Sequence, residues 1–107
     1  MAMFDPAHPG ELIRELINGL TEETGEKLTI ETVAIGLGTT RKTLSAIING
    51  KQSITTEMAL RLSTAFGNTA ESWLHAQENY DLAQARKKVD TKQVKVFWHP
   101  QPALALR

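Results

Sequence analysis

The stretch from Leu28 to Lys51 most constrains this chain, because it has the pattern of two short helices joined by a tight turn. Apolar residues recur at helical spacing from Ile30 to Leu37, and Gly38 follows them. A glycine at this place indicates a helix end, since glycine adopts left-handed dihedral angles without a steric penalty. After Thr39, we expect the second helix to run from Thr40 to Asn49.

Both predicted helices begin at a threonine, Thr29 or Thr40, whose side chain can accept a hydrogen bond from a first-turn N–H group. The second helix is expected to bury Leu44, Ile47 and Ile48. Its opposite side carries cations and short hydroxyl groups, namely Thr40, Arg41, Lys42, Thr43 and Ser45. An apolar inner face under such an outer face suits a helix that lies in the major groove of DNA.

We therefore expect Arg41 and Lys42 to read bases, since either can donate to the O6 and N7 edge of guanine. Ser45 shares their face, and Ala46 can contact a thymine methyl group. Polar residues around the two helices are predicted to hold the DNA backbone: Thr29, Thr39, Thr40, Thr43, Asn49, Lys51 and Ser53. Two alternatives stay open: Lys42 can be a simple phosphate contact, and several of the polar residues can serve only as helix caps.

The charge is distributed unevenly, although 12 cations and 12 acids give a net charge of zero. Residues 1–26 hold one cation and six acids (−5), residues 27–61 hold five cations and two acids (+3), and residues 62–107 hold six and four (+2). The zero sum argues against indiscriminate nucleic-acid binding, while the positive charge centres on the predicted recognition helix. One copy would bind weakly, so we expect a homodimer that reads a palindrome with two-fold symmetry.

An earlier helix is predicted to open at His8-Pro9-Gly10, because proline is favoured in the first turn of a helix. Its buried face is expected to hold the apolar residues from Leu12 to Leu20. Gly19 is expected to begin its end, and residues 21–27 are expected to form a charged loop.

Two more helices are predicted, capped by Thr55 or Thr56 and by Thr69, and the last should reach about Lys88. Residues 93–98, QVKVFW, alternate in the manner of a short strand that needs a partner, either its own copy or another chain. The fold class is thus all-α, with five helices and a short C-terminal β-strand, in one domain over residues 1–107. Its helix-turn-helix core spans about 8–67, and a dimerisation helix and tail span about 69–107. The predicted dimer contacts are Trp73, Tyr80, Val94, Val96, Phe97 and Trp98. For Trp73 and Tyr80 a place in the core stays open as the alternative.

Together these motifs resemble a known family. The stretch from Ala34 to Lys51 resembles the helix-turn-helix of phage repressors of the Cro/cI (XRE) type. With the flanking segments HPGELIREL, SITTEMALRLSTAFG and ESWLHAQENYDL, the chain is similar to HigA-type antitoxins, also called VapI-like or plasmid-maintenance antidote proteins. The resemblance implies a repressor of its own operon that also neutralises a HigB-like, mRNA-cleaving toxin.

Other classes of protein are less compatible with the sequence. The three histidines are scattered, there is no cysteine, and no nucleophile motif or phosphate-binding glycine loop occurs, so we expect no metal, no cofactor and no enzyme activity. No membrane span or signal peptide is apparent, and a cytoplasmic location is expected. Two further hypotheses stay open: the chain can be a solitary transcriptional regulator without a toxin, or a protein-binding module that no longer binds DNA.

Overall fold

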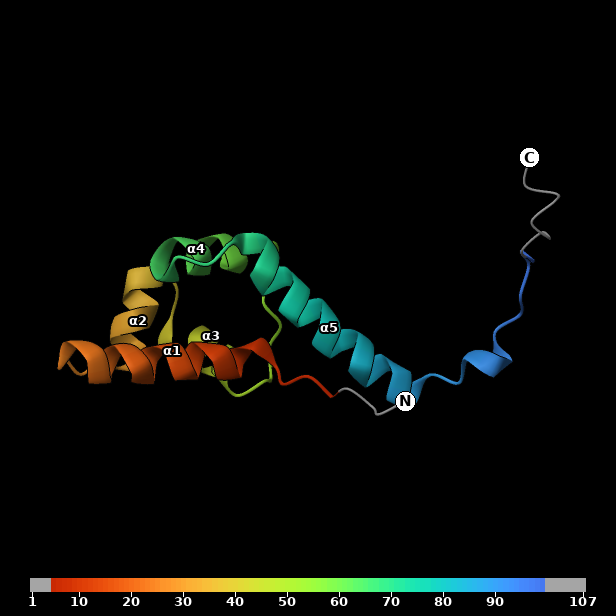
Figure 1. Cartoon of the computed structure of the whole chain (residues 1–107), viewed down its shortest axis with the longest axis horizontal. Coiled ribbons are helices and arrows are strands. Elements are labelled where there is room, and N and C mark those ends of the chain that lie inside the picture. The colour runs from red at the N-terminus through yellow and green to blue at the C-terminus, as the bar shows by residue number, and fades with distance from the viewer. Residues whose placement is uncertain (1–4, 100–107) are drawn as a thin grey trace.

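The computed structural model describes residues 5–99 and contains five α-helices (Figure 1). They are α1 (Pro9–Thr24), α2 (Ile30–Leu37), α3 (Arg41–Ile48), α4 (Thr56–Phe66) and α5 (Ala70–Lys88), followed by a 3-10 turn at Thr91–Gln93. Residues 1–4 and 100–107, which belong to the predicted single domain, lie outside the described residues. Among the described residues, no helix is both long and apolar enough to cross a lipid bilayer.

Threonine caps begin four of these helices, as the sequence predicts. The hydroxyl oxygens of Thr29, Thr40, Thr55 and Thr69 each accept a hydrogen bond from the backbone N–H three residues later. Each cap satisfies one of the first-turn N–H groups that have no partner within the helix. The choice left open between Thr55 and Thr56 is therefore decided in favour of Thr55.

The first helix is longer than predicted. It continues through Gly19 to Thr24 and ends at Gly25, whose φ of 75° lies in the left-handed region. Gly19 lowers helix stability by only about 1 kcal/mol relative to alanine, which is too little to end a helix that packs against a core. The predicted loop at 21–27 therefore shrinks to the few residues before Thr29. Leu12, expected on the buried face, is 38% exposed.

The start of α1 lies directly against α3. A Cβ atom on Gly10 would be 1.9 Å from the carbonyl oxygen of Ile47, so only glycine fits there. His8 caps α1, because its Nδ1 accepts a hydrogen bond of 2.9 Å from the Gly10 N–H. Its ring also meets the ring of Tyr80 edge-on, with centroids 4.9 Å apart. The HPG segment thus joins α1, the end of α3 and α5.

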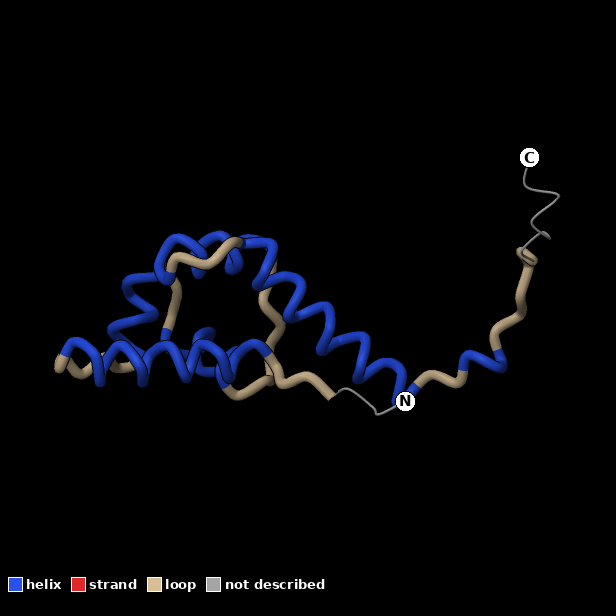
Figure 2. Tube along the Cα trace, viewed as in Figure 1, coloured by secondary structure: helices blue, strands red, loops and turns tan. Residues whose placement is uncertain are grey.

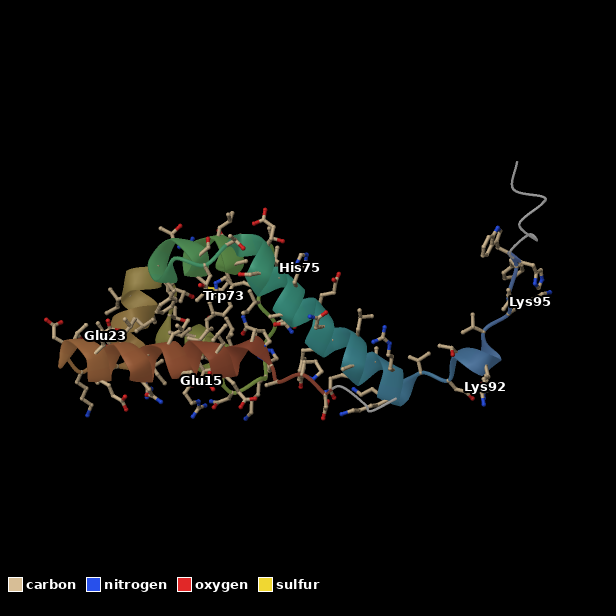
Figure 3. All side chains as sticks on the ribbon, viewed as in Figure 1. Glu15, Glu23, Trp73, His75, Lys92 and Lys95 are labelled. Carbon is tan, nitrogen blue, oxygen red and sulfur yellow. The ribbon has the colours of Figure 1, made fainter. Side chains whose placement is uncertain are left out.

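One hydrophobic core holds all five helices together, and its most deeply buried large side chains are Ile13, Leu44, Ile47, Leu62 and Trp73. Trp73 points from α5 into the body in Figure 3 and is only 1% exposed. It is therefore a core residue, and its predicted role as a dimer contact is wrong, because no surface of it is left for a partner. Ile54, in the loop before α4, is also buried in this core.

The segment after α5 does not form the predicted strand. Within residues 5–99 no strand is present, and Val94 to His99 form an irregular segment that leads away from the helices (Figure 2). A strand needs a neighbouring strand to receive its backbone hydrogen bonds, and the single chain offers none.

Candidate nucleic-acid interface

The recognition helix α3 has one buried and one solvent-facing side. Leu44, Ile47 and Ile48 are at most 4% exposed and attach α3 to the core. The two predicted base-reading cations, Arg41 and Lys42, are both exposed, whereas Ser45 and Ala46 are half-buried beside them. The structure thus presents the cationic side of α3 to solvent, on a helix that its own packing holds in place.

The turn before α3 is held in place by Arg61 of α4, a residue for which the sequence predicted no role. Gly38 adopts a φ of 78° and ends α2. The Arg61 guanidinium of α4 donates 2.8 and 3.5 Å hydrogen bonds to the carbonyl oxygens of Leu37 and Gly38. A cation at the C-terminal end of a helix is favourable, because the last carbonyl groups have no partner within the helix. Arg61 therefore holds the angle between α2 and α3 and is not a free cation of the patch.

Several predicted backbone contacts also serve as caps. The Thr40 hydroxyl accepts from the Thr43 N–H at 3.1 Å and donates to the Thr43 hydroxyl at 3.0 Å. The Thr29 and Thr32 hydroxyls lie 2.9 Å apart in the corresponding arrangement on α2. Since the cap uses the hydrogen of Thr40, the Thr43 hydroxyl is the group at this site that remains able to donate outward.

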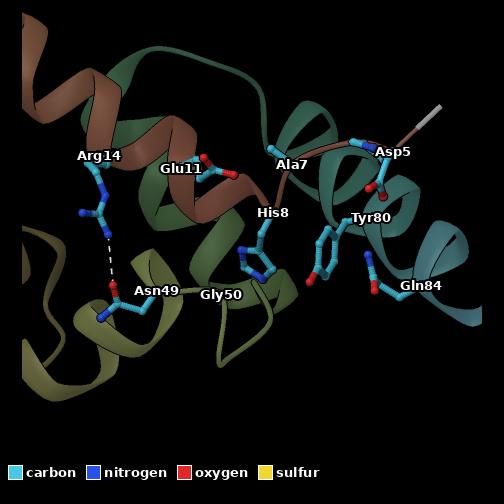
Figure 4. A pocket seen from close by; sticks show the side chains of 10 residues that line it. Asp5, Ala7, His8, Glu11, Arg14, Asn49, Gly50, Tyr80 and Gln84 are labelled. Atoms are coloured by element: carbon cyan, nitrogen blue, oxygen red, sulfur yellow. Dashed lines mark hydrogen bonds between the residues drawn. The ribbon is translucent and has the colours of Figure 1, made fainter.

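Two surface regions gather the remaining polar residues. A hollow between α3 and the start of α4 brings together Thr39, Thr43 and Ser53, and its walls also include Gln52, Thr55 and Arg61. Asn49 lies on another part of the surface, where Arg14 of α1 donates a 3.0 Å hydrogen bond to its side-chain oxygen (Figure 4). Thr29 and Lys51 are exposed and line neither region. The sequence marks Arg14 as the one cation among residues 1–26, but it gives no sign of the contact with Asn49.

The surface around Asn49 and Arg14 forms a second hollow, and His8 also lines it (Figure 4). Burial lowers the pKa of His8, and the nearby carboxylates Asp81 and Glu11 oppose that shift in part. The neutral ring suits its position, because a protonated Nδ1 could not accept the hydrogen bond from Gly10. His8 is thus a structural residue of this surface.

The predicted dimer residues lie in different environments. Tyr80 is half-buried against His8, so only part of its ring is available to a second chain. Large apolar side chains of the C-terminal segment are exposed: Val94 by 60%, Val96 by 60%, Phe97 by 84% and Trp98 by 72%. Leu82, towards the end of α5, is 44% exposed. Among residues 5–99, large apolar side chains are thus exposed along the C-terminal segment and at the end of α5, and Ile35 of α2 and Leu60 of α4 are exposed as well.

Comparisons with known proteins agree with this geometry. Residues 25–74 match the family described as Helix-turn-helix. Virulence-associated protein A' of Dichelobacter nodosus is 42% identical over 99 residues, which cover 92% of this chain and 80% of that protein. The chain belongs to the helix-turn-helix family of HigA-type antidote proteins. The predicted resemblance is confirmed.

Solved structures of the family have the same fold. An addiction module antidote protein of the HigA family from Coxiella burnetii superposes with a TM-score of 0.75 at 34% identity, covering 88% of this chain and 100% of that one. The Pseudomonas aeruginosa antitoxin HigA, solved with the higBA promoter, gives a TM-score of 0.69 at 28% identity, covering 89% and 97%.

Proposed function

We propose that this protein is a sequence-specific repressor that binds operator DNA as a homodimer, with α3 in the major groove. The exposed Arg41 and Lys42 on a helix whose other side is fully buried carry this proposal. A rigid mount matters, because a bidentate contact with a base discriminates by about 1–3 kcal/mol only when its geometry is held. The Pseudomonas aeruginosa HigA complex with its promoter supports the same use of the fold.

Within this proposal the side chains divide into two groups. Arg41, Lys42, Ser45 and Ala46 contact base edges. The backbone contacts are Thr29, Thr39, Thr40, Thr43, Asn49, Lys51 and Ser53. Of the Thr40–Thr43 pair, the Thr43 hydroxyl donates to the phosphate, because the Thr40 hydroxyl hydrogen is used within the cap. The hollow that joins Thr39, Thr43 and Ser53 offers hydroxyl donors to a backbone phosphate, and the Glu57 carboxylate in its wall is paired with the Arg61 guanidinium at 3.4 Å. Occupation of an operator that overlaps a promoter would block transcription without any chemical step.

The dimer contact is assigned to Tyr80 and to the exposed C-terminal segment, within a single domain over residues 1–107. Val94, Val96 and Trp98 alternate along that segment, so that two copies paired as antiparallel strands would bury them together. Such pairing would also provide the backbone partners that the single chain lacks. In this arrangement the strand predicted from the sequence forms only on association.

The second proposed activity is neutralisation of a HigB-like, mRNA-cleaving toxin. Its support is similarity to proteins named as antitoxins or antidotes, including those from Coxiella burnetii and Pseudomonas aeruginosa. The competing proposal is a regulator without a toxin, which is consistent with the similarity to an Escherichia coli protein called HTH-type transcriptional regulator YddM (30% identical, covering 89% of this chain and 95% of that one).

Gel-shift titration of the protein's own promoter fragment tests the DNA proposal. The Arg41→Ala/Lys42→Ala variant should lose the specific shift, while an Arg86→Ala/Lys88→Ala variant, which removes two exposed cations from the end of α5, should keep it. Equal shifts by the parent and the α3 variant would refute DNA recognition by the outer face of α3. The protein-binding module would then be the remaining hypothesis.

Co-expression with the neighbouring reading frame separates the antitoxin from the solitary regulator. If the chain is an antitoxin, a tagged copy of it should co-purify with a small basic protein encoded by that frame. It should also relieve the growth arrest that the small basic protein causes when expressed alone. A neighbouring product that neither arrests growth nor binds would favour the solitary regulator.

A further inference from the structure

Arg14 is placed unusually for its part of the chain. It is the one cation among residues 1–26, which also carry six acids. Its Nη2 donates to the Asn49 side-chain oxygen at 3.0 Å, and both residues are exposed. Figure 4 shows the Arg14 side chain extending from α1 towards Asn49, while the Glu11 carboxylate points elsewhere. Among residues 5–99 the Arg14 guanidinium forms no ion pair.

The contact lies at the end of the proposed DNA-binding face. Lys42, Ser45, Ala46 and Asn49 are spaced three and four residues apart, so they form one row along the outside of α3. The Asn49 amide nitrogen lies 3.4 Å from the Ser45 hydroxyl, within the same row. Arg14 meets the last member of that row from outside the helix. The row therefore begins at the cation Lys42 and ends at an asparagine that contacts the cation Arg14.

The free hydrogen-bonding groups of this pair match a phosphate. A guanidinium has five N–H donors in a planar fork, and the bond to Asn49 uses one of them. Arginine with several free donors suits the oxygen atoms of a phosphate better than a lysine does. The Asn49 amide group keeps a second N–H besides the one directed towards Ser45.

A purely structural role does not account for an exposed arginine here. Gly10 against the Ile47 backbone and the buried Ile13 side chain already join α1 to α3. An exposed hydrogen bond adds only about 1 kcal/mol to such an interface.

We propose that Arg14 and Asn49 together bind one backbone phosphate of the operator, beyond the C-terminal end of α3. This inference rests on the proposed DNA-binding function and adds to it a contact from α1, outside the helix-turn-helix motif. It gives the otherwise acidic first helix a DNA contact and extends the footprint of each half-site.

Salt-dependent binding to the operator fragment tests the proposal. Affinity falls as salt rises, and each lost phosphate contact lowers the magnitude of the slope of log affinity against log salt by about 0.9, so Arg14→Ala should lower this magnitude by about 1.8 in a dimer. Arg14→Gln keeps a donor for Asn49 but removes the charge, and it should lower the slope equally. Arg14→Lys keeps the charge and should keep most of the slope. A Lys92→Ala control removes a tail cation that lies away from α1 and α3 (Figure 3) and should leave the slope unchanged.

The outcomes separate this contact from the function on which it rests. If the parent binds its operator and Arg14→Gln has the slope of the parent, Arg14 only holds Asn49 and the proposal is wrong. The same conclusion holds if Lys92→Ala lowers the slope as much as Arg14→Ala does. If the parent itself does not bind, the DNA-binding function fails before Arg14 is tested. Thermal unfolding of each variant checks that the fold is kept.

Discussion

The two tryptophans of this chain lie in opposite environments. Trp73, at the start of α5, is 1% exposed in a core that all five helices share, whereas Trp98, in the segment after α5, is 72% exposed. Gln77 of α5 further stabilises the core around Trp73, since its side-chain oxygen accepts a 2.8 Å hydrogen bond from the Ile54 N–H of the loop before α4. The core around Trp73 is thus formed within one chain, whereas the apolar side chains of the C-terminal segment stay exposed in it.

The largest expected effect separates these tryptophans directly. Trp73→Ala should lower the free energy of unfolding by about 3–5 kcal/mol, because it leaves a large cavity. Trp98→Ala should change the unfolding of the monomer by less than about 0.5 kcal/mol, as expected for an exposed side chain. It should nevertheless weaken dimerisation in sedimentation or light scattering. Equal unfolding midpoints in urea for the two variants would contradict the comparison.

Two glycines of α1 test the packing of the body. Gly10→Ala places a Cβ atom against the Ile47 backbone and should destabilise the protein by about 1–3 kcal/mol. Gly19→Ala meets no atom within 4 Å and should stabilise the helix by about 1 kcal/mol. Thermal unfolding measures both changes. A destabilising Gly19→Ala would mean that α1 does not continue past this position.

The protonation of His8 gives a pH dependence that belongs to the body. Burial lowers the pKa of His8 in the folded protein, so the unfolded chain binds the proton first. Stability from the neutral ring is complete above about pH 6.5 and is lost as the pH falls from there towards the folded-state pKa. His8→Asn keeps a capping side chain that does not titrate, and its stability should fall less over the same interval. Urea midpoints at several pH values measure the difference, and parallel curves would contradict it.

The smallest expected effect concerns the end of α5. Lys87 forms a 3.0 Å ion pair with Asp5, and both side chains are more than half exposed. Exposed pairs of this kind contribute about 0–1 kcal/mol, so Lys87→Ala should barely change the unfolding midpoint. A loss comparable to that of Trp73→Ala would show that the end of α5 is as firmly fixed as its beginning.

The helix boundaries show how far local chemistry can be predicted. Thr29, Thr40 and Thr69 were predicted as caps, and all three are confirmed, because a cap depends on a hydroxyl and an N–H three residues apart. Gly38 is likewise confirmed as the end of α2. The end of α1 was predicted wrongly, since packing of Ile17 against the core outweighs the weak helix-breaking tendency of Gly19.

The candidate interface likewise has features that the sequence predicts and contacts that it does not. The composition of the outer face of α3 was evident from residue spacing, because a helix repeats every 3.6 residues. The contacts of Arg14 and Arg61 were not, since their partners Asn49 and Leu37 lie 35 and 24 residues away. No periodicity within one helix indicates which carbonyl or amide a neighbouring helix will place beside it.

By itself the sequence determined where helices begin, which of their sides are apolar and which helix carries the exposed cations, because these properties depend on residues within one or two turns. Tertiary structure decided the length of α1, the burial of Trp73 and the positions of Arg14 and Arg61. It also left the strand predicted at residues 93–98 unformed. Packing and strand pairing depend on surfaces that are distant in the sequence, and a strand without a neighbour cannot satisfy its own backbone.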